Sequence, residues 1–157
     1  TEFLSDRVGA WGGAFAVGVS LARWRAEFEA ATWQTTTRTF APGARAEVNV
    51  DDLALRIGRT FEVGVMRLDA TLGLLVGLHR ATATGITTPT RGSATLLAVM
   101  AAVRACLPLA RIIGVCATLR PWFAPRSASF TVAPYGTVYD AGPVGLQGLL
   151  DVTARIP

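Results

Sequence analysis

The sequence lacks several residue types, and each absence narrows the class of protein. It contains no lysine, because all fifteen basic residues of the 157-residue chain are arginine. The net charge is +4, but the arginines are dispersed among apolar residues instead of clustered, which argues against a nucleic-acid partner. Two cysteines are too few for a disulfide scaffold, and the single histidine has no metal-ligand company. We therefore expect no metal and no cofactor.

Charged residues and long apolar runs are also scarce. Charged residues make up 17% of the chain and hydrophobic residues 51%, with a mean hydropathy of +0.41. An average soluble domain is about one quarter charged. No run of about 18 apolar residues occurs, so the sequence predicts no membrane-spanning helix. Such a chain must hide its apolar residues in a large core or face lipid as a closed β-barrel.

What the sequence does contain is strict alternation of side-chain type. The stretch "RWRAEFEA", residues 23–30, places a charged residue at every odd position and an apolar one at every even position. This period of two residues is typical of a β-strand with one charged face and one apolar face.

Seven segments alternate in this way, with large apolar residues on one face and glycine, small or charged residues on the other. They span residues 8–21, 23–33, 53–66, 71–81, 94–107, 112–123 and 144–156. A tilted strand needs about 9–11 residues to cross a bilayer, which these lengths provide.

The connections between these segments alternate in length, as in outer-membrane barrels. Short ones are expected near Leu21–Ala22, Arg67–Ala70 and Pro108–Arg111. Long ones, rich in Thr, Ser, Pro and Gly, occupy residues 34–52, 84–93 and 124–143.

We therefore predict one domain, residues 1–157, that forms an all-β, antiparallel transmembrane barrel of about eight strands, seven of them clearly present. A narrow lumen favours small residues and charges that are paired with one another, which would plug it. The alternative is a selective pore, although an eight-stranded lumen is just wide enough for side chains to fill. The lumen charge network is predicted to comprise Arg23, Arg25, Glu27, Glu29, Arg56, Glu62, Arg104, Arg120, Asp151 and Arg155. The predicted lipid-facing residues are Trp24, Phe28, Leu55, Leu74, Val76, Val115 and Val152.

The charged-aromatic strand, the glycine-flanked apolar strands and the closing "DAGPVGLQGLLDVTARI" resemble small bacterial outer-membrane β-barrels of the OmpA-like class. They are most similar to the compact barrel domains of myxobacterial proteins. The resemblance implies a location in the outer membrane of a Gram-negative bacterium. Such barrels usually end in an aromatic residue, whereas this sequence ends in Arg155-Ile156-Pro157. Either the true terminus lies further on, or insertion uses another signal.

The expected function is a non-enzymatic structural, anchoring or surface-interaction module. Its expected partners are outer-membrane lipid and other protein subunits, bound through the long loops or a missing strand. One alternative is a soluble β-barrel that carries an apolar ligand, which requires polar residues in place of Trp24, Leu74 and Val115. Another is an outer-membrane enzyme, which requires a nucleophile beside His79. A third concerns fold alone: residues 94–119 are rich in Ala, Leu and Met and are also compatible with a helical hairpin.

Individual positions carry further expectations. Arg59 falls on the apolar face, where either a bulge at Gly58 turns it inward or it meets a partner protein, and we favour the bulge. Cys106 and Cys116 lie on the inner faces of adjacent strands, where a disulfide and two free thiols are equally compatible with the spacing. Several aromatic residues near strand ends are expected to form a girdle: Trp11, Trp24, Trp33, Trp122, Tyr135 and Tyr139.

Seven strands leave the first and last running in the same direction, so an eighth is needed to close the barrel. One candidate is the segment 127–138, "SASFTVAPYGTV". The other is sequence upstream of Thr1 or a strand from a partner chain. We favour the second, with residues 124–142 forming an external loop or hairpin extension.

Overall fold

The computed structural model describes residues 11–34, 38–41, 43–85, 90–132 and 136–154. Within these ranges all regular secondary structure is β-strand. The strands are β1 (Trp11–Leu21), β2 (Trp24–Gln34), β3 (Arg38–Ala41), β4 (Ala44–Val63), β5 (Met66–Thr84), β6 (Thr90–Pro108), β7 (Ile113–Phe123), β8 (Ser129–Val132), β9 (Gly136–Asp140) and β10 (Val144–Ala154).

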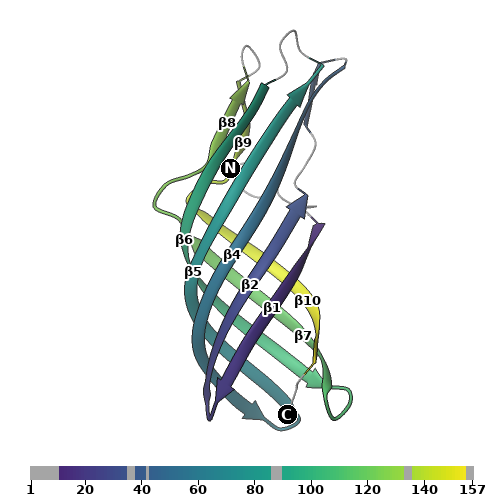
Figure 1. Ribbon diagram of the computed structural model, residues 1–157, viewed down its shortest axis with the longest axis vertical. Coiled ribbons are helices and arrows are strands. Elements are labelled where there is room, and N and C mark those ends of the chain that lie inside the picture. Colours follow the sequence, from purple (N-terminus) through teal and green to yellow (C-terminus); the bar gives the residue numbers. More distant parts are fainter. Residues whose placement is uncertain (1–10, 35–37, 42, 86–89, 133–135, 155–157) are drawn as a thin grey trace.

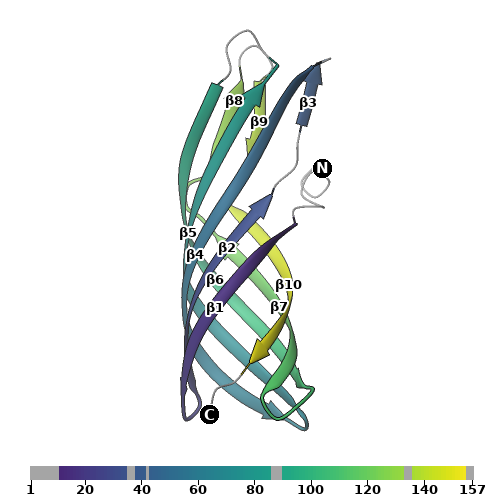
Figure 2. The same ribbon diagram turned by 45° about the vertical axis from the view of Figure 1, so that its right-hand side comes forward.

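Seven of the strands form a single antiparallel path, β1-β2-β4-β5-β6-β7-β10, that follows the order of the chain. Figures 1 and 2 show this sheet curled about the long axis of the molecule. The expectation of an antiparallel all-β fold with seven main strands is confirmed. The helical hairpin is wrong, because residues 94–119 lie in β6 and β7.

Tight turns join the strands at one end of the molecule. Ala22 and Arg23 connect β1 to β2, and Gly64 and Val65 connect β4 to β5. Gly64 has a φ of +60°, a left-handed conformation that glycine adopts without a steric penalty. The turn expected at residues 67–70 is therefore misplaced, because those residues lie within β5. Gly64 also fits the small-residue face of the alternation, which concealed its role as a turn residue.

Three strands are much longer than the sequence pattern predicts. β4 has 20 residues and β5 and β6 have 19 each, whereas β1, β2, β7 and β10 have 11 each. The additional residues of β4 and β6 come mostly from the segments 34–52 and 84–93, which were expected to be long connections, and those of β5 are residues 66–70 and 82–84. The ends of β4, β5 and β6, together with β3, β8 and β9, project beyond the shorter strands, as Figures 1 and 2 show. We call this projecting part the extension.

The segment between β7 and β10 forms a separate hairpin and not an eighth strand of the sheet. β8 pairs with β9 in its own two-stranded sheet, while β7 pairs directly with β10 from Val144↔Phe123 to Ala154↔Ile113. The hairpin extension expected for residues 124–142 is thus confirmed, and the candidate strand at 127–138 is excluded.

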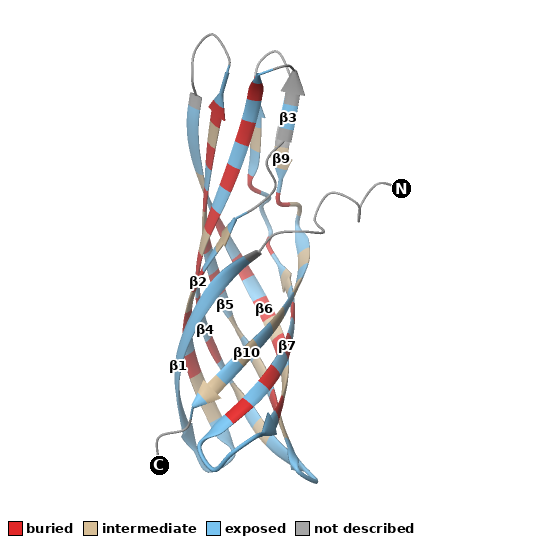
Figure 3. Cartoon of the chain, turned by 90° about the vertical axis from the view of Figure 1, so that its right-hand side faces the viewer, coloured by how far each residue is buried: buried red, intermediate tan, exposed pale blue. Residues whose placement is uncertain are grey.

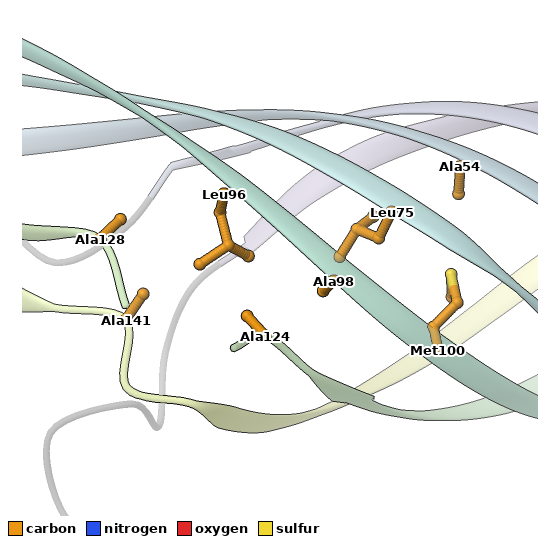
Figure 4. Packing of buried hydrophobic residues seen from close by; sticks show 8 residues of the cluster. All are labelled: Ala54, Leu75, Leu96, Ala98, Met100, Ala124, Ala128 and Ala141. Carbon is orange, nitrogen blue, oxygen red and sulfur yellow. The ribbon is translucent and has the colours of Figure 1, made fainter. Parts of the chain in front are cut away.

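Buried apolar side chains gather on the concave side toward the extension. The cluster in Figure 4 contains Leu75 of β5, Leu96 and Met100 of β6, and small residues of the chain around them. Of two further clusters, one contains Ala46 and Ala83, and the other contains Val48 and Val50. Phe130 of β8 and Tyr139 of β9 pack against both. The β8–β9 hairpin therefore covers the inner face of the extension.

Candidate functional site: the apolar belt and the charged interior

The outer surface of the shorter part of the sheet is a continuous apolar band, which we call the belt. Its large side chains are 38–84% exposed. They include Phe15, Val17 and Val19 of β1, Phe28 of β2, Leu53, Leu55 and Ile57 of β4, Leu72, Leu74 and Val76 of β5, Leu97, Val99 and Val103 of β6, Val115 and Leu119 of β7, and Leu146, Leu150 and Val152 of β10. All seven residues predicted to face lipid are exposed on this surface. Figure 3 shows the alternation of exposed and buried residues that produces it.

Along β4 the polarity of the outer face changes abruptly. Below the change, toward the end with the tight turns, Leu55 and Leu53 are half or more exposed. Above it, toward the extension, the strand continues without interruption, and its outer positions are Asp51, Asn49, Glu47 and Arg45. Because successive side chains alternate between faces, both sets lie on the same side of the sheet.

The same change occurs at registered positions on the neighbouring strands. On β5 the outer face passes from Val76 and Leu78 to Arg80, and on β6 from Leu97 to Thr95. Leu78 pairs with both Asp51 and Thr95, so the change on β5 falls two residues beyond the changes on β4 and β6. The belt therefore has a common upper boundary on three strands.

The inner face of β4 also changes near this level. Above the boundary its inner side chains include Ala44, Ala46, Val48 and Val50, which are all buried. Below it Arg56 of β4 and Glu27 and Glu29 of β2 are buried, while Ala54, Leu75 and Met100 keep another part of the interior apolar. The extension thus has a mainly apolar interior and a polar surface, whereas the interior behind the belt also holds buried charges.

Glu27 and Glu29 of β2 lie at the centre of the charged interior. Glu27 accepts hydrogen bonds from Arg25, Arg56 and Arg104, the last at 3.2 Å. Glu29 accepts hydrogen bonds from Arg56 and Arg120. Arg120 is 1% exposed, and a charge so deeply buried needs such a partner because desolvation costs several kcal/mol per ion.

These contacts cross the interior, because Arg104 of β6 and Arg120 of β7 are not on strands that neighbour β2. Arg104 also forms an ion pair with Asp151 of β10. The network therefore joins opposite walls of the curled sheet, and it fills the space that a pore would need.

A second cluster surrounds Asp69 of β5. Arg67 donates a hydrogen bond to its carboxylate at 2.9 Å, Thr60 donates another at 2.7 Å, and Arg25 lies 3.8 Å away. Arg25 therefore connects Asp69 to Glu27. The sequence analysis missed Arg67 and Asp69 because it placed them in a turn, although their alternation with Leu68 could have identified them.

Two residues predicted for the lumen network, Arg23 and Glu62, do not belong to it. Arg23 lies exposed in the β1–β2 turn, where its carbonyl accepts a hydrogen bond from the Thr60 amide. Glu62 is exposed near the end of β4. Both positions follow the alternation but lie too close to the turns to reach the interior. Arg155 lies outside the described residues.

Asp52 lies on the inner face of β4 at the boundary of the belt. It is 6% exposed and accepts a hydrogen bond from the Trp33 indole at 3.0 Å. The sequence analysis did not single out this buried carboxylate.

His79 lies on the inner face of β5 and contacts the hairpin. Its Nδ1 is 3.0 Å from the hydroxyl of Tyr139, and the two rings are 5.6 Å apart. Among the described residues, no group of His, Cys, Asp and Glu is arranged to hold a metal ion.

Arg59 remains on the outer face, and the expected bulge is wrong. The register of β4 with β2 and with β5 runs through Gly58 without a shift. The Arg59 guanidinium lies 4.8 Å from the centre of the Trp24 ring instead. An arginine near a strand end in contact with an exposed tryptophan satisfies its charge through a cation–π interaction and can extend toward water.

The aromatic girdle is largely wrong as predicted. Trp24 is exposed, but Trp33, Trp122 and Tyr139 pack with the inner clusters. The Trp11 side chain and Tyr135 lie outside the described part of the chain. Strand-end position alone does not reveal which face an aromatic residue occupies.

Cys106 of β6 and Cys116 of β7 are directly paired in register and joined by a disulfide. Both are buried, at 6% and 1% exposure. The sequence left the choice between a disulfide and free thiols open, because a slip of one residue pair would have separated the two sulfur atoms.

Comparison with protein-family models, curated proteins and solved structures finds no match to this chain. Within the described residues, no helix is long and apolar enough to cross a membrane.

Proposed function

We propose that this chain is an integral outer-membrane β-barrel domain of a Gram-negative bacterium. It acts as a non-enzymatic structural, anchoring or surface-interaction module of the small OmpA-like type. Lipid surrounds the belt, the extension projects into water, and the charged interior plugs the lumen.

The observation that carries this proposal is the registered reversal of polarity along β4, β5 and β6. In a single solvent, a continuous strand keeps its apolar face on one side, because the same side borders the core throughout. Here the apolar face is inside above Asp51 and outside below it. Two solvents meeting at one level, water above and hydrocarbon below, account for this change.

The belt also argues against a soluble carrier of an apolar ligand. That alternative requires polar residues at Trp24, Leu74 and Val115, which are apolar and 51%, 54% and 38% exposed. So large an apolar surface is a liability in water. A soluble carrier of an apolar ligand also requires an apolar interior, but Glu27, Glu29 and Arg120 are buried there.

The network of charged side chains in the interior favours a structural role over transport. Five arginines and four carboxylates, Arg25, Arg56, Arg67, Arg104, Arg120, Glu27, Glu29, Asp69 and Asp151, are bonded to one another across it. An eight-stranded barrel is just wide enough for side chains to fill. Surface recognition would then fall to the extension.

The test is membrane extraction of the chain expressed with an outer-membrane targeting signal. We expect it to resist alkaline carbonate, to require detergent, and to migrate faster on a gel before boiling than after. Full release by carbonate with an unchanged band would overturn the proposal.

A further inference from the structure

Arg59 is a charged residue within the apolar belt. On the outer face of β4, from Leu53 to Val63, every other side chain is apolar, and Arg59 is exposed among them. Its neighbours across the sheet are Trp24 of β2 and Ala70 of β5. Among the described residues, no carboxylate forms an ion pair with Arg59. The counter-charge for this guanidinium must therefore come from outside the described part of the chain.

Trp24 holds the guanidinium without using its hydrogen-bond donors. The Arg59 Cζ atom lies 4.8 Å from the centre of the Trp24 ring, a cation–π contact. Within the part of the chain that the structure describes, no group accepts a hydrogen bond from Arg59. On the other flank, Ala70 places only a methyl group on the outer face. The N–H groups of the guanidinium are thus available to an acceptor that approaches from the outer side.

Both residues lie toward the end with the tight turns. Trp24 is the first residue of β2, directly after the β1–β2 turn, and Arg59 is followed by four further residues of β4, which ends at Val63. At about 3.3 Å per residue and a tilt of about 40°, the Arg59 Cα lies roughly 10 Å from that end. The headgroup layer on each side of a bilayer is roughly 5–8 Å thick. An arginine side chain that extends toward water reaches this layer.

We propose that Arg59 and Trp24 form a binding site for the phosphate group of an acidic phospholipid, in the leaflet on the side of the tight turns. The inference rests on the proposed function. The planar guanidinium donates two parallel hydrogen bonds to two phosphate oxygens, a geometry that arginine provides and lysine does not. Trp24, Ile57 and Phe61, which are exposed beside Arg59, contact the glycerol and the acyl chains.

The surroundings of Arg59 also select the headgroup. The described outer positions around it are apolar and carry no carboxylate that would attract the ammonium group of a zwitterionic headgroup. The local charge on the outer face is the single positive charge of Arg59. A headgroup with a net negative charge, such as phosphatidylglycerol, is therefore favoured over phosphatidylethanolamine.

Retention of lipid by the purified protein tests the inference. The complete chain in detergent is incubated with phosphatidylglycerol and released from micelles in a mass spectrometer that preserves non-covalent complexes. We expect the parent protein to retain one phosphatidylglycerol and Arg59→Gln to bind it roughly tenfold or more weakly, as for the loss of charge-assisted hydrogen bonds. Trp24→Leu should bind it about two- to fivefold more weakly, the range for an exposed cation–π contact.

Arg80→Gln is the matched control. Arg80 is also exposed on the outer face, but it lies above the belt and forms an ion pair with Asp51. This variant should retain as much phosphatidylglycerol as the parent protein. A heat-modifiable gel band shows that each variant is folded before its lipid is measured. Phosphatidylethanolamine should be retained less, diacylglycerol, which lacks the phosphate, should not be retained, and inorganic phosphate should not displace the lipid.

Four results would overturn the inference: equal retention by Arg59→Gln and Arg80→Gln, equal retention of diacylglycerol, displacement of the lipid by inorganic phosphate, or a dimer that only Arg59→Gln dissociates. The last result would assign Arg59 to a contact with a second copy of the chain. In each case a carbonate-resistant protein leaves the proposed function standing. Complete release of the parent protein by carbonate would instead reject the proposed function, and the inference with it.

Discussion

Glu27 holds together more of the interior than any other single side chain described. Three arginines from three strands donate to its carboxylate. Replacing it with a neutral residue leaves Arg25, Arg56 and Arg104 with one carboxylate partner each, Asp69, Glu29 and Asp151, and removes the charge that balances three buried or half-buried guanidinium groups at once.

We expect Glu27→Gln to lower the free energy of unfolding by about 3–5 kcal/mol, the range for breaking a buried ion pair. The measurement is denaturant unfolding in detergent micelles, followed by tryptophan fluorescence. Glu62→Gln is the matched control, because Glu62 is exposed on the adjacent strand and should change stability little. Equal effects of the two substitutions would show that the network contributes nothing specific.

At the scale of single elements, the upper boundary of the belt separates positions that look alike in sequence. Leu74 and Thr82 lie on the outer face of the same strand, one within the belt and one above it. Arginine in hydrocarbon at mid-depth costs about 2–4 kcal/mol, and little near water.

We therefore expect Leu74→Arg to destabilise the domain by about 2–4 kcal/mol in lipid vesicles, and Thr82→Arg by less than about 1 kcal/mol. Equilibrium unfolding in vesicles measures both. A larger loss for Thr82→Arg would place the boundary elsewhere on β5.

The disulfide stabilises the connection between β6 and β7. It closes a segment with a sequence separation of 10, for which loop-closure entropy predicts a contribution of roughly 3 kcal/mol. We expect the double substitution Cys106→Ser and Cys116→Ser to lower stability by about that amount. Intact-mass analysis after alkylation without reductant should find no free thiol in the parent protein, and two would contradict the bond.

A strand could be predicted from the sequence wherever apolar residues stay on the same set of alternate positions, odd or even, along its whole length. All seven main strands follow from apolar residues at every second position, as in β10. The upper half of β4 alternates equally well in "ARAEVNV", but there the apolar residues are at even numbers, whereas below Asp51 they are at odd numbers. The reversal looks like the end of a strand unless two environments are assumed.

The contacts between side chains could be predicted from the sequence less completely than the strands. The inner placement of Glu27, Arg56 and Arg104 follows from alternation, but contacts across the interior depend on curvature, which no local pattern encodes. Arg67 and Asp69 were missed because the backbone freedom of Gly64, and not the polar residues after it, determines the turn.

For the molecule as a whole, the proposal predicts a depth profile. Spin labels at belt positions should be accessible to oxygen but not to a water-soluble nickel complex, and labels above the boundary should show the reverse. The belt set is Phe28, Leu55, Val76 and Val152, and the upper set is Glu47, Thr84 and Ser93. Labels at the inward residues Arg25, Gly73 and Asp151 should report no lipid. Belt and upper sets that behave alike would reject the membrane orientation.

Because β4 passes through the boundary without interruption, only certain insertions and deletions in this strand preserve the fold. Deleting one residue below Asp51 would move every following side chain to the opposite face, which would exchange Leu55 with Arg56 and turn the interior charges outward into the belt. Deleting two residues would keep the faces and only shorten the strand. Length variation in this strand should therefore be tolerated in steps of two residues.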